Sequence, residues 1–341
     1  MAPYVPVVIP GLTGNLKPLS HSIDDYPEGI ILPVDKPYRW TSADVIRKLK
    51  YAAIKHFGKK NLKVGHAGTL DPLATGVLLV CIGNACKKAQ QLQDTDKEYI
   101  AGIRFGATTP SYDLEKNVDR TFPYGHITED AVRAALPAFL GEQDQIAPLF
   151  SAKSVDGVRA YELARKLYKQ AVIPGSTGNL PDFDSAALST LHHSRIVISE
   201  LELLEFVPAE EDRDSLSENS VPLRSTPAPP IASCVPASRE LVFNGPLPLP
   251  VCGGAHVSER ESLSSSASSR INVSETAGMG LPEAVIRIAC SKGTYIRAFA
   301  RDLGEALGSG AHLGSLIRSR SGRFAVSDSL SLDDALSLLA Q

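Results

Sequence analysis

KVGHAGTLDPLATGVL, residues Lys63–Leu78, is the stretch that determines how the rest of this chain is organised. It leads into the fully apolar run Val77–Ile82, which has the composition of a buried β-strand. The residues before that run include Gly65, Gly68 and Gly76, and glycine permits tight turns and close approach of neighbouring groups to the backbone. The stretch therefore predicts a tight loop that enters a strand of the hydrophobic core.

One carboxylate, Asp71, lies in the middle of this loop. Pro72 follows it and biases its backbone toward the extended region. We expect Asp71 to project from the loop at the edge of the core, where a ligand can reach it. A second interpretation is that Asp71 caps a helix whose first residue is Pro72, which is a common arrangement. The residues alone do not decide between the two.

Strands and helices are predicted to alternate on both sides of this loop. The expected strands cover Gly29–Pro33, Val77–Ile82, Tyr99–Phe105 and Ala284–Cys290. The expected helices begin at Thr41 or Ser42 and cover residues 128–140, Tyr161–Leu167 and Thr294–Leu307. This mixed order predicts an α+β domain around a mixed or antiparallel sheet.

The composition is that of a globular protein in a reducing compartment. The chain has 341 residues, of which 43% are hydrophobic. Its five cysteines show no CxxC pair and no spacing of a zinc site or a disulfide framework, so we expect the cytoplasm and no metal. No apolar run approaches the roughly 20 residues that cross a bilayer. Residues 1–28 open with MAPYVPVVIPG, which lacks a basic region, and we expect a surface arm there rather than a signal peptide.

Residues 208–282 differ in composition from the sequence on either side. Serine and proline dominate them, and no periodicity is visible. Such a segment buries too little apolar surface to offset its ordering entropy, so we expect a mobile insertion in a single domain formed by residues 29–207 and 283–341. The insertion holds nine of the 38 acidic residues but only five of the 35 basic ones. The formal net charge of -3 therefore does not exclude a nucleic-acid ligand.

Two basic stretches supply the local positive charge that nucleic-acid binding requires. Arg47–Lys63 carries seven basic residues and no acidic one, and Arg287–Arg323 carries seven against Asp302 and Glu305. A basic surface for a nucleic acid is one interpretation of them. A solvated helix face is the alternative interpretation of either stretch.

The run GHAGTLDPLATGVLLV (65–80) closely resembles the signature motif of the TruB family of pseudouridine synthases, which modify uridine 55 in the T loop of tRNA. Three further runs resemble other motifs of the family: DKPYRWTSADV (35–45), DKEY (96–99) and SKGTYIRAFARDLGEALGSGAHLGSLIRSRSGRF (291–324). In the first of them, Tyr38 and Arg39 replace the small residues more usual in the family. The resemblance covers about residues 29–170 and 284–335. It implies the pseudouridine synthase fold, a mixed, mostly antiparallel sheet flanked by helices.

The resemblance implies catalytic roles for three residues. Asp71 matches the catalytic aspartate, and Arg297 matches an arginine that pairs with it. Pseudouridylation breaks the C1′–N1 bond of a uridine, turns the uracil and joins its C5 to C1′. A carboxylate serves this as a nucleophile at the sugar or as a base at C2′, and both roles stay open for Asp71. Tyr99 matches a tyrosine that stacks on the flipped uracil.

Four more residues match substrate-binding positions of the family. Tyr295 matches a second tyrosine of the pocket, and Leu316 matches a leucine that lines its apolar wall. His66 matches a histidine that contacts the T loop where bases are displaced. Lys87 lies where the family has a lysine, at a phosphate or at the edge of the site. Aromatic faces offset part of the unstacking cost of a flipped base, about a few kcal/mol.

The implied partner is the T stem-loop of tRNA, bound by a monomer without a cofactor, metal, guide RNA or membrane. Only 25 residues follow Leu316, which are too few for the C-terminal PUA domain of many members, so the resemblance points to a short bacterial form. The alternatives are a tRNA-binding or tRNA-folding protein with secondary catalysis, and a pseudouridine synthase for another RNA. Because a pure binder does not need the matched pocket residues, their presence favours the enzyme.

Overall fold

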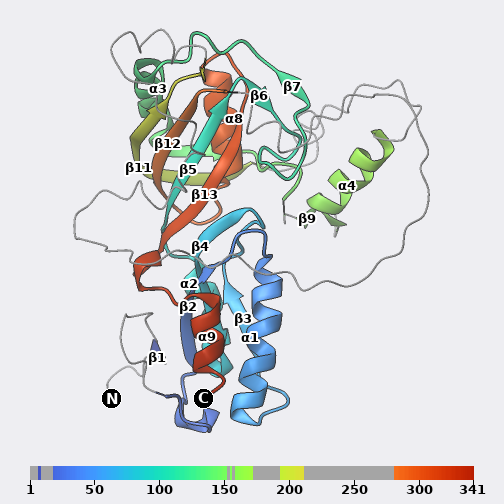
Figure 1. The fold of residues 1–341 in the computed structure, drawn as a ribbon, viewed down its shortest axis with the longest axis vertical. Coiled ribbons are helices and arrows are strands. Elements are labelled where there is room, and N and C mark those ends of the chain that lie inside the picture. Colours follow the sequence, from blue (N-terminus) through green and yellow to red (C-terminus); the bar gives the residue numbers. More distant parts are fainter. Residues whose placement is uncertain (1–6, 9–17, 152–153, 156–157, 172–192, 211–279) are drawn as a thin grey trace.

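The computed structural model describes residues 7–8, 18–151, 154–155, 158–171, 193–210 and 280–341, which form an elongated body built on one long sheet (Figure 1). The strands are β1 (Val7–Val8), β2 (Ile30–Lys36), β3 (Val64–Ala67), β4 (Ala74–Ile82), β5 (Lys97–Phe105), β6 (Ala107–Thr108), β7 (Arg120–Thr121), β8 (Gly141–Gln145), β9 (Ser154–Val155), β10 (Val158–Arg159), β11 (Ser194–Val207), β12 (Glu283–Cys290), β13 (Ala311–Ser321) and β14 (Phe324–Ala325). The α-helices are α1 (Ser42–Phe57), α2 (Ala89–Gln93), α3 (Glu129–Ala135), α4 (Ala160–Ala171), α8 (Ile296–Ala306) and α9 (Leu332–Leu338). Short 3₁₀ turns are η1 (Ile23–Asp25), η2 (Gly83–Lys88), η3 (Leu136–Phe139) and η6 (Val326–Asp328).

The main sheet runs in the order β1-β2-β4-β13-β5-β12-β11-β8, with β3 on β4 and β14 on β13. Among the described strands, the β1–β2 and β4–β13 pairs are parallel, and the other pairs of this sheet are antiparallel. The expected α+β class with a mixed, mostly antiparallel sheet is confirmed. The β4–β13 pair joins segments that are far apart in the sequence. Leu316, for example, pairs with Ala74.

Strand β4 is apolar throughout because both of its faces are buried. Leu78, Val80 and Ile82 belong to the core beneath α1 and α9. The alternate residues belong to a second cluster with Phe324: Val77, Leu79 and Cys81. A strand buried on both faces loses the alternation of apolar and polar residues, which explains the run at the end of the motif.

Helix α1 begins where its sequence predicts. The Thr41 hydroxyl accepts a hydrogen bond from the Asp44 backbone N–H at 3.0 Å, and the Asp44 carboxylate accepts one from the Thr41 N–H at 3.2 Å. This reciprocal capping box satisfies two N–H groups that have no partner inside the helix. Gly58 ends the helix in the left-handed region with φ of 62°.

Besides the cluster with Phe324, two larger hydrophobic cores lie on the sheet. One lies between β2, β4, α1 and α9, and the other lies between β5, β12, β13, α8 and α3 (Figure 1). Tyr99 on β5 and Leu316 on β13 pack against both cores. The junction of the two cores is therefore lined by two residues that the sequence assigns to the substrate pocket.

The predicted elements are confirmed with small shifts at their ends. The helix expected over residues 128–140 is a short α-helix, α3, followed by the 3₁₀ turn η3. Pro137 causes this change because it has no N–H to continue the α-helical pattern. Two long strands, β11 and β13, were not predicted. None of the described helices is long and apolar enough to cross a membrane.

The expected surface arm is attached more closely than the sequence suggested. Val7 and Val8 pair in parallel with Ile30 and Ile31. Farther along, Leu19 is buried against the first core. The insertion at 208–282 connects β11 to β12, and residues 211–279 lie outside the described part. Its two ends meet, since the Glu210 N–H donates to the Gly280 carbonyl at 3.0 Å.

A buried histidine in β13 predicts a pH-dependent stability. His312 is fully buried, and its Nδ1 lies 2.9 Å from the Ala107 carbonyl oxygen. Burial lowers the pKa of His312 to about 4, and Arg104 acts in the same direction. Because the unfolded state binds the proton more tightly, stability is lost as pH falls from about 6.5 toward 4. We expect this histidine to account for about 2 kcal/mol of lost unfolding free energy between pH 7.5 and pH 5.

Urea unfolding at pH 7.5 and pH 5.0 checks this expectation. His312→Gln should lose about 2 kcal/mol less than the unsubstituted chain over that interval, because glutamine does not titrate. His193→Gln, at an exposed position, is the matched control and should behave as the unsubstituted chain. Equal losses in the His312 and His193 variants would contradict the expectation.

Candidate active site

The loop between β3 and β4 presents Asp71 in a tight turn. The Ala74 N–H donates to the Asp71 carbonyl at 3.1 Å, and Pro72 occupies the second position of the turn. No helix begins at Pro72, so the alternative that Asp71 is a helix cap is wrong. The Asp71 side chain is 39% exposed, which leaves its carboxylate open to a ligand.

Two buried polar side chains, Lys36 and Ser42, hold the backbone of this loop by hydrogen bonds. The Lys36 ammonium group donates to the carbonyls of Pro37 at 2.9 Å, Trp40 at 2.6 Å and Pro72 at 3.1 Å. The Ser42 hydroxyl donates to the Leu70 carbonyl at 3.0 Å and lies 2.9 Å from the Leu70 N–H that donates to it. The start of α1 and the turn before it therefore fix the backbone on both sides of Asp71.

Arg318 on β13 holds the other side of the loop. Its guanidinium donates to the Val77 carbonyl at 2.7 Å and to the Gly68 carbonyl at 3.1 Å. Gly76 lets β13 come this close, because a Cβ there would lie 2.3 Å from the Arg318 carbonyl oxygen, and its φ is 96°. Gly68 also has a positive φ, of 89°. Gly65 does not have a positive φ, so its backbone conformation does not require glycine.

The central contact of the site is an ion pair between Asp71 and Arg297. Arg297 lies in the first turn of α8 and is only 5% exposed. Its Nε donates to Asp71 Oδ2 at 2.9 Å, and its other nitrogens donate to the carbonyls of Ser111 and Phe150, each at 3.0 Å. The expected pairing of Asp71 with Arg297 is thus present in the structure. Three fixed partners hold the guanidinium rigidly, so the carboxylate is oriented before a substrate arrives.

A second carboxylate, Asp113, belongs to the same network. Its Oδ2 lies 3.8 Å from Arg297 Nε, and its Oδ1 accepts hydrogen bonds from the Ser111 hydroxyl at 2.6 Å and the Glu115 N–H at 2.9 Å. Burial raises the pKa of Asp113, although Arg297 opposes that effect. Burial also acts to lower the pKa of Arg297, but Asp71 and Asp113 raise it overall. Sequence analysis missed Asp113, and its only signal is a carboxylate in a polar turn segment after β6.

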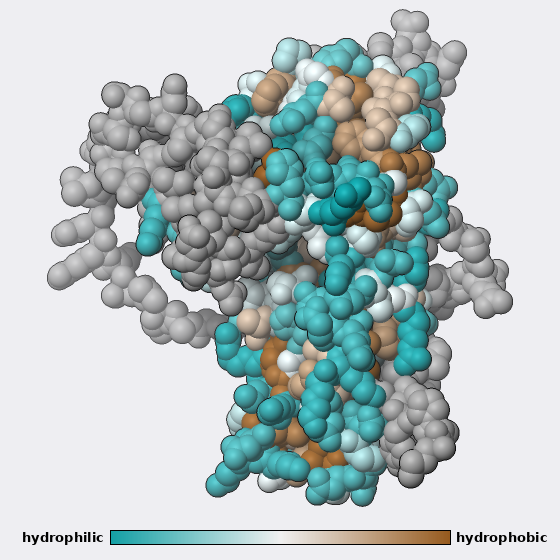
Figure 2. Space-filling view, turned by 180° about the vertical axis from the view of Figure 1, so that it is seen from behind, coloured by the Kyte–Doolittle hydropathy of each residue, from teal (hydrophilic) through white to brown (hydrophobic). Residues whose placement is uncertain are grey.

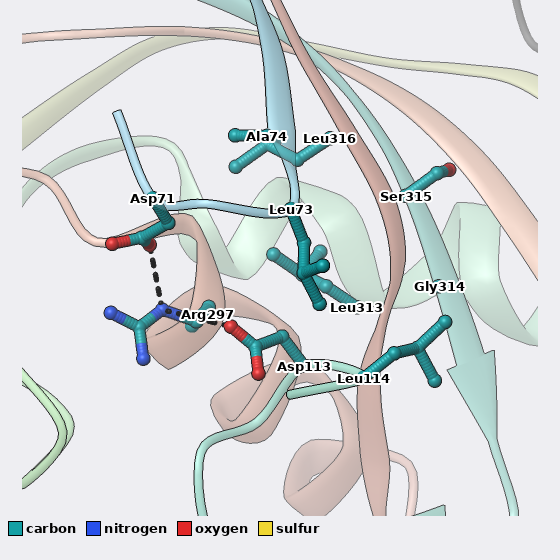
Figure 3. Close-up of a pocket in the computed structure, with 10 residues that line it drawn as sticks. All are labelled: Asp71, Leu73, Ala74, Asp113, Leu114, Arg297, Leu313, Gly314, Ser315 and Leu316. Carbon is teal, nitrogen blue, oxygen red and sulfur yellow. Dashed lines mark hydrogen bonds and ion pairs between the residues drawn. The ribbon is translucent and has the colours of Figure 1, made fainter. Parts of the chain in front are cut away.

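These charges lie at one side of a small pocket with an apolar wall (Figure 3). Figure 3 shows Arg297 between the two carboxylates, with Leu73 and Leu313 beside them. The lining residues come from the β3–β4 loop, the 110–119 segment, α8 and β13: Asp71, Leu73, Ala74, Asp113, Leu114, Arg297, Leu313, Gly314, Ser315 and Leu316. Leu316 thus lies in the wall of this pocket.

Both predicted tyrosines lie around the site without lining this pocket. Tyr99 is half-buried on β5 opposite Arg318, and Tyr295 is half-buried at the N-cap of α8, two residues before Arg297. Burial raises the pKa of both phenols, which keeps their hydroxyls protonated at neutral pH. Gln145 fixes the backbone of Tyr295, since its Oε1 accepts from the Tyr295 N–H at 2.8 Å.

His66 and Lys87 do not line the pocket of Asp71 either. His66 is half-buried on β3 opposite Val80, and its Nδ1 is buried without a hydrogen-bond partner among the described residues. Burial and Arg318 lower the pKa of His66, so the ring is neutral. Lys87 is exposed in η2. The structure does not bring either residue into the pocket of Asp71.

The second basic stretch is not the basic surface that the sequence suggested. Arg297 and Arg318 are buried inside the site. Arg287 forms ion pairs with Glu202 at 2.7 Å and Glu200 at 3.1 Å. Acids from other strands therefore neutralise charges that looked unbalanced in the sequence. All seven basic side chains of the first stretch are exposed, which fits both a nucleic-acid surface and a solvated helix face: Arg47, Lys48, Lys50, Lys55, Lys59, Lys60 and Lys63.

Lys36 belongs to the run DKPYRWTSADV (35–45), but the sequence analysis predicted no role for it. The signal for a structural role is a lysine close behind the apolar run of β2. Burial lowers its pKa to about 8, whereas Asp71 and Asp35 act to raise it. Lys36→Met should lower the free energy of unfolding by about 2–3 kcal/mol, because three buried carbonyls lose their donor. Urea unfolding at pH 7 measures the change, with Lys55→Met as the exposed control. A loss below about 0.5 kcal/mol would show that the ammonium does not hold the loop.

Comparisons with known proteins show which sequences and structures this chain is similar to. A sequence profile described as TruB family pseudouridylate synthase (N terminal domain) matches residues 54–175. A protein named tRNA pseudouridine synthase B from Phocaeicola vulgatus is 38% identical over 309 residues, which cover 91% of this chain and 92% of that protein. A protein of the same name from Bacteroides fragilis is 38% identical over 298 residues, covering 87% and 88%. Among solved structures, the crystal structure of a Cbf5-Nop10-Gar1 complex shares 19% identity with a TM-score of 0.48, covering 92% of this chain and 56% of that one.

Proposed function

This chain belongs to the TruB family of tRNA pseudouridine synthases, which are isomerases, and from that membership we propose that it converts uridine 55 in the T loop of tRNA to pseudouridine, with Asp71 as the catalytic carboxylate. The observation that carries the proposal is the Asp71–Arg297 ion pair at the edge of an apolar pocket. An exposed carboxylate held by a buried guanidinium is a fixed negative charge facing the substrate.

The reaction balances without any added reagent. The C1′–N1 bond breaks, the C5–C1′ bond forms, C5 loses its proton and N1 gains one. Asp71 acts at the sugar, either by attacking C1′ or by removing the C2′ proton. Arg297 holds the carboxylate for either step, and its other bonds to Ser111 and Phe150 prevent it from turning away.

The remaining predicted residues bind the tRNA in this proposal, three of them at the flipped nucleotide. Uridine 55 leaves the T loop and its base lies near Tyr99, while Leu316 forms the apolar wall of the pocket. Stacking on an aromatic ring offsets part of the cost of unstacking the base. Tyr295 borders the site at the start of α8. His66 and Lys87, outside the pocket, contact the tRNA beyond the flipped nucleotide.

Mapping of the modified position tests the proposed site of action. An unmodified tRNA transcript and a matched transcript with cytidine at position 55 are incubated with the protein. Pseudouridine is then located by carbodiimide labelling and primer extension. We expect one labelled position, 55, in the first transcript and none in the second. Labelling of another position in the cytidine transcript would contradict the assignment to uridine 55.

A further inference from the structure

The first basic stretch forms an exposed surface that the proposed reaction does not use. Arg47, Tyr51 and Lys55 are four residues apart on α1, so they lie on one face of the helix. The turn before the helix exposes two more side chains beside that face. We name these residues the α1 surface: Tyr38, Arg39, Arg47, Lys48, Tyr51 and Lys55, all of which are exposed.

Exposed aromatic rings distinguish this surface from an ordinary solvated helix face. The large hydrophobic side chains that stand exposed in the described part of the chain are Tyr38, Tyr51, Leu140 and Val197. Both aromatic ones, Tyr38 at 50% and Tyr51 at 76% exposure, lie on the α1 surface. Seen from behind, the lower half of the molecule is largely hydrophilic, with separate hydrophobic patches between the polar residues (Figure 2). Aromatic rings among cations suit a partner with negative charges and flat bases.

Arg39 occupies a backbone conformation that favours glycine. Its φ is 65°, in the left-handed region, where a side chain is disfavoured. Its guanidinium lies 5.5 Å from the centre of the Tyr38 ring, so the pair presents a cation and an aromatic face together. Strained residues of this kind cluster where the side chain serves a ligand.

The α1 surface carries a net positive charge where the turn before α1 meets the first turns of the helix. An open hollow there is lined by Arg39, Trp40, Asp44, Arg47 and Lys48. Asp44 pairs with Arg47 at 2.7 Å, and the Lys48 ammonium lies 5.0 Å from the centre of the Trp40 ring. Three cations against one carboxylate leave charge available for phosphate groups.

The turn is coupled to the catalytic loop through one ammonium group. Lys36 donates to the Trp40 carbonyl at 2.6 Å and to the Pro72 carbonyl at 3.1 Å. Pro72 follows Asp71 directly. The turn that carries Tyr38 and Arg39 is therefore linked to the backbone next to Asp71.

We propose that the α1 surface binds the tRNA strand that adjoins the uridine held at Asp71. Its cations contact phosphates, and its exposed tyrosines pack against ribose or an unstacked base. The inference rests on the proposed function, because it takes tRNA as the substrate. Such contacts position the tRNA without reading its sequence.

Equilibrium binding of a full-length tRNA transcript tests the proposal, with Asp71→Asn in every protein so that no turnover occurs. Arg39→Gly and Tyr51→Ala are compared with Arg133→Gln, which removes an exposed, paired charge on α3. We expect Kd to rise about 5-fold or more for the first two variants and to stay unchanged for the third. Arg39→Gly should also reduce the slope of log Kd against log salt by about one.

Stability separates a binding role from a structural one. Arg39→Gly should unfold at an equal or higher urea concentration, because glycine adopts φ of 65° at lower cost. Weaker tRNA binding by a protein of undiminished stability supports the proposal. Kd values within 2-fold of the Arg133→Gln control for both variants would overturn it. Pseudouridine formation by the protein with Asp71 intact is measured in parallel, and its absence would overturn the proposed function instead.

Discussion

Replacing Asp71 with asparagine is expected to abolish pseudouridine formation while leaving tRNA binding almost intact. Asparagine has the same shape, so the turn and the pocket wall are preserved. It has no negative charge and neither attacks C1′ nor removes a proton from C2′. We expect the single-turnover rate constant to fall by at least about 10⁴-fold, as it does when the central group of an active site is removed.

Time courses with excess protein measure this rate constant, and the dissociation constant of tRNA is measured on the same preparation. Asp328→Asn, at an exposed position near the C-terminus, is the matched control and should react at the unsubstituted rate. The Kd of Asp71→Asn should lie within about 3-fold of the unsubstituted value, since one exposed side chain is changed. Retention of more than about 1% of the rate would remove Asp71 from the chemistry.

Replacing Arg297 with methionine is expected to cost both stability and activity. The guanidinium is 5% exposed and lies between Asp71 and Asp113. Its removal leaves the buried Asp113 without its cation and leaves the carbonyls of Ser111 and Phe150 without a donor. Loss of one partner of a buried ion pair lowers the free energy of unfolding by about 3–5 kcal/mol. The rate constant should fall by about 10²–10³-fold, because Asp71 is no longer oriented.

Urea unfolding and single-turnover kinetics measure the two losses. Arg297→Lys keeps the positive charge but cannot make the three directed bonds, so it should recover part of the stability and little of the rate. Arg133→Met, on the exposed side of α3, controls for the loss of an arginine. A loss of stability below about 1 kcal/mol in Arg297→Met would show that the network around Asp113 does not depend on this residue.

The local elements could be predicted because their signals are local. The helix at Thr41 follows from a capping box of four residues, Thr41–Asp44, and β4 follows from an uninterrupted apolar run. The position of Asp71 in a loop follows from the glycines and Pro72 around it. The pairing of Asp71 with Arg297 spans 226 residues and came from the family resemblance rather than from any local pattern.

Two of the unpredicted features, β13 and Asp113, hold buried polar groups. Strand β13 carries Arg318 and Ser321 in the interior, so it lacks the apolar alternation by which strands are recognised. Arg318 is tolerated there because the Val77 carbonyl of β4 and the Gly68 carbonyl of the β3–β4 loop accept hydrogen bonds from its guanidinium. Asp113 was not predicted either. Its carboxylate is buried beside Arg297, which comes from a distant helix, so no local pattern in the sequence marks it.

The most direct test of the central claim is tritium release from a tRNA transcript that carries uridine labelled at C5. Formation of the C5–C1′ bond expels the C5 hydrogen, so release counts completed isomerisations. We predict release equivalent to one uridine per tRNA by the unsubstituted protein and none by Asp71→Asn. Release by both proteins, or by neither while tRNA is bound, would contradict the assignment of Asp71 as the catalytic carboxylate of this reaction.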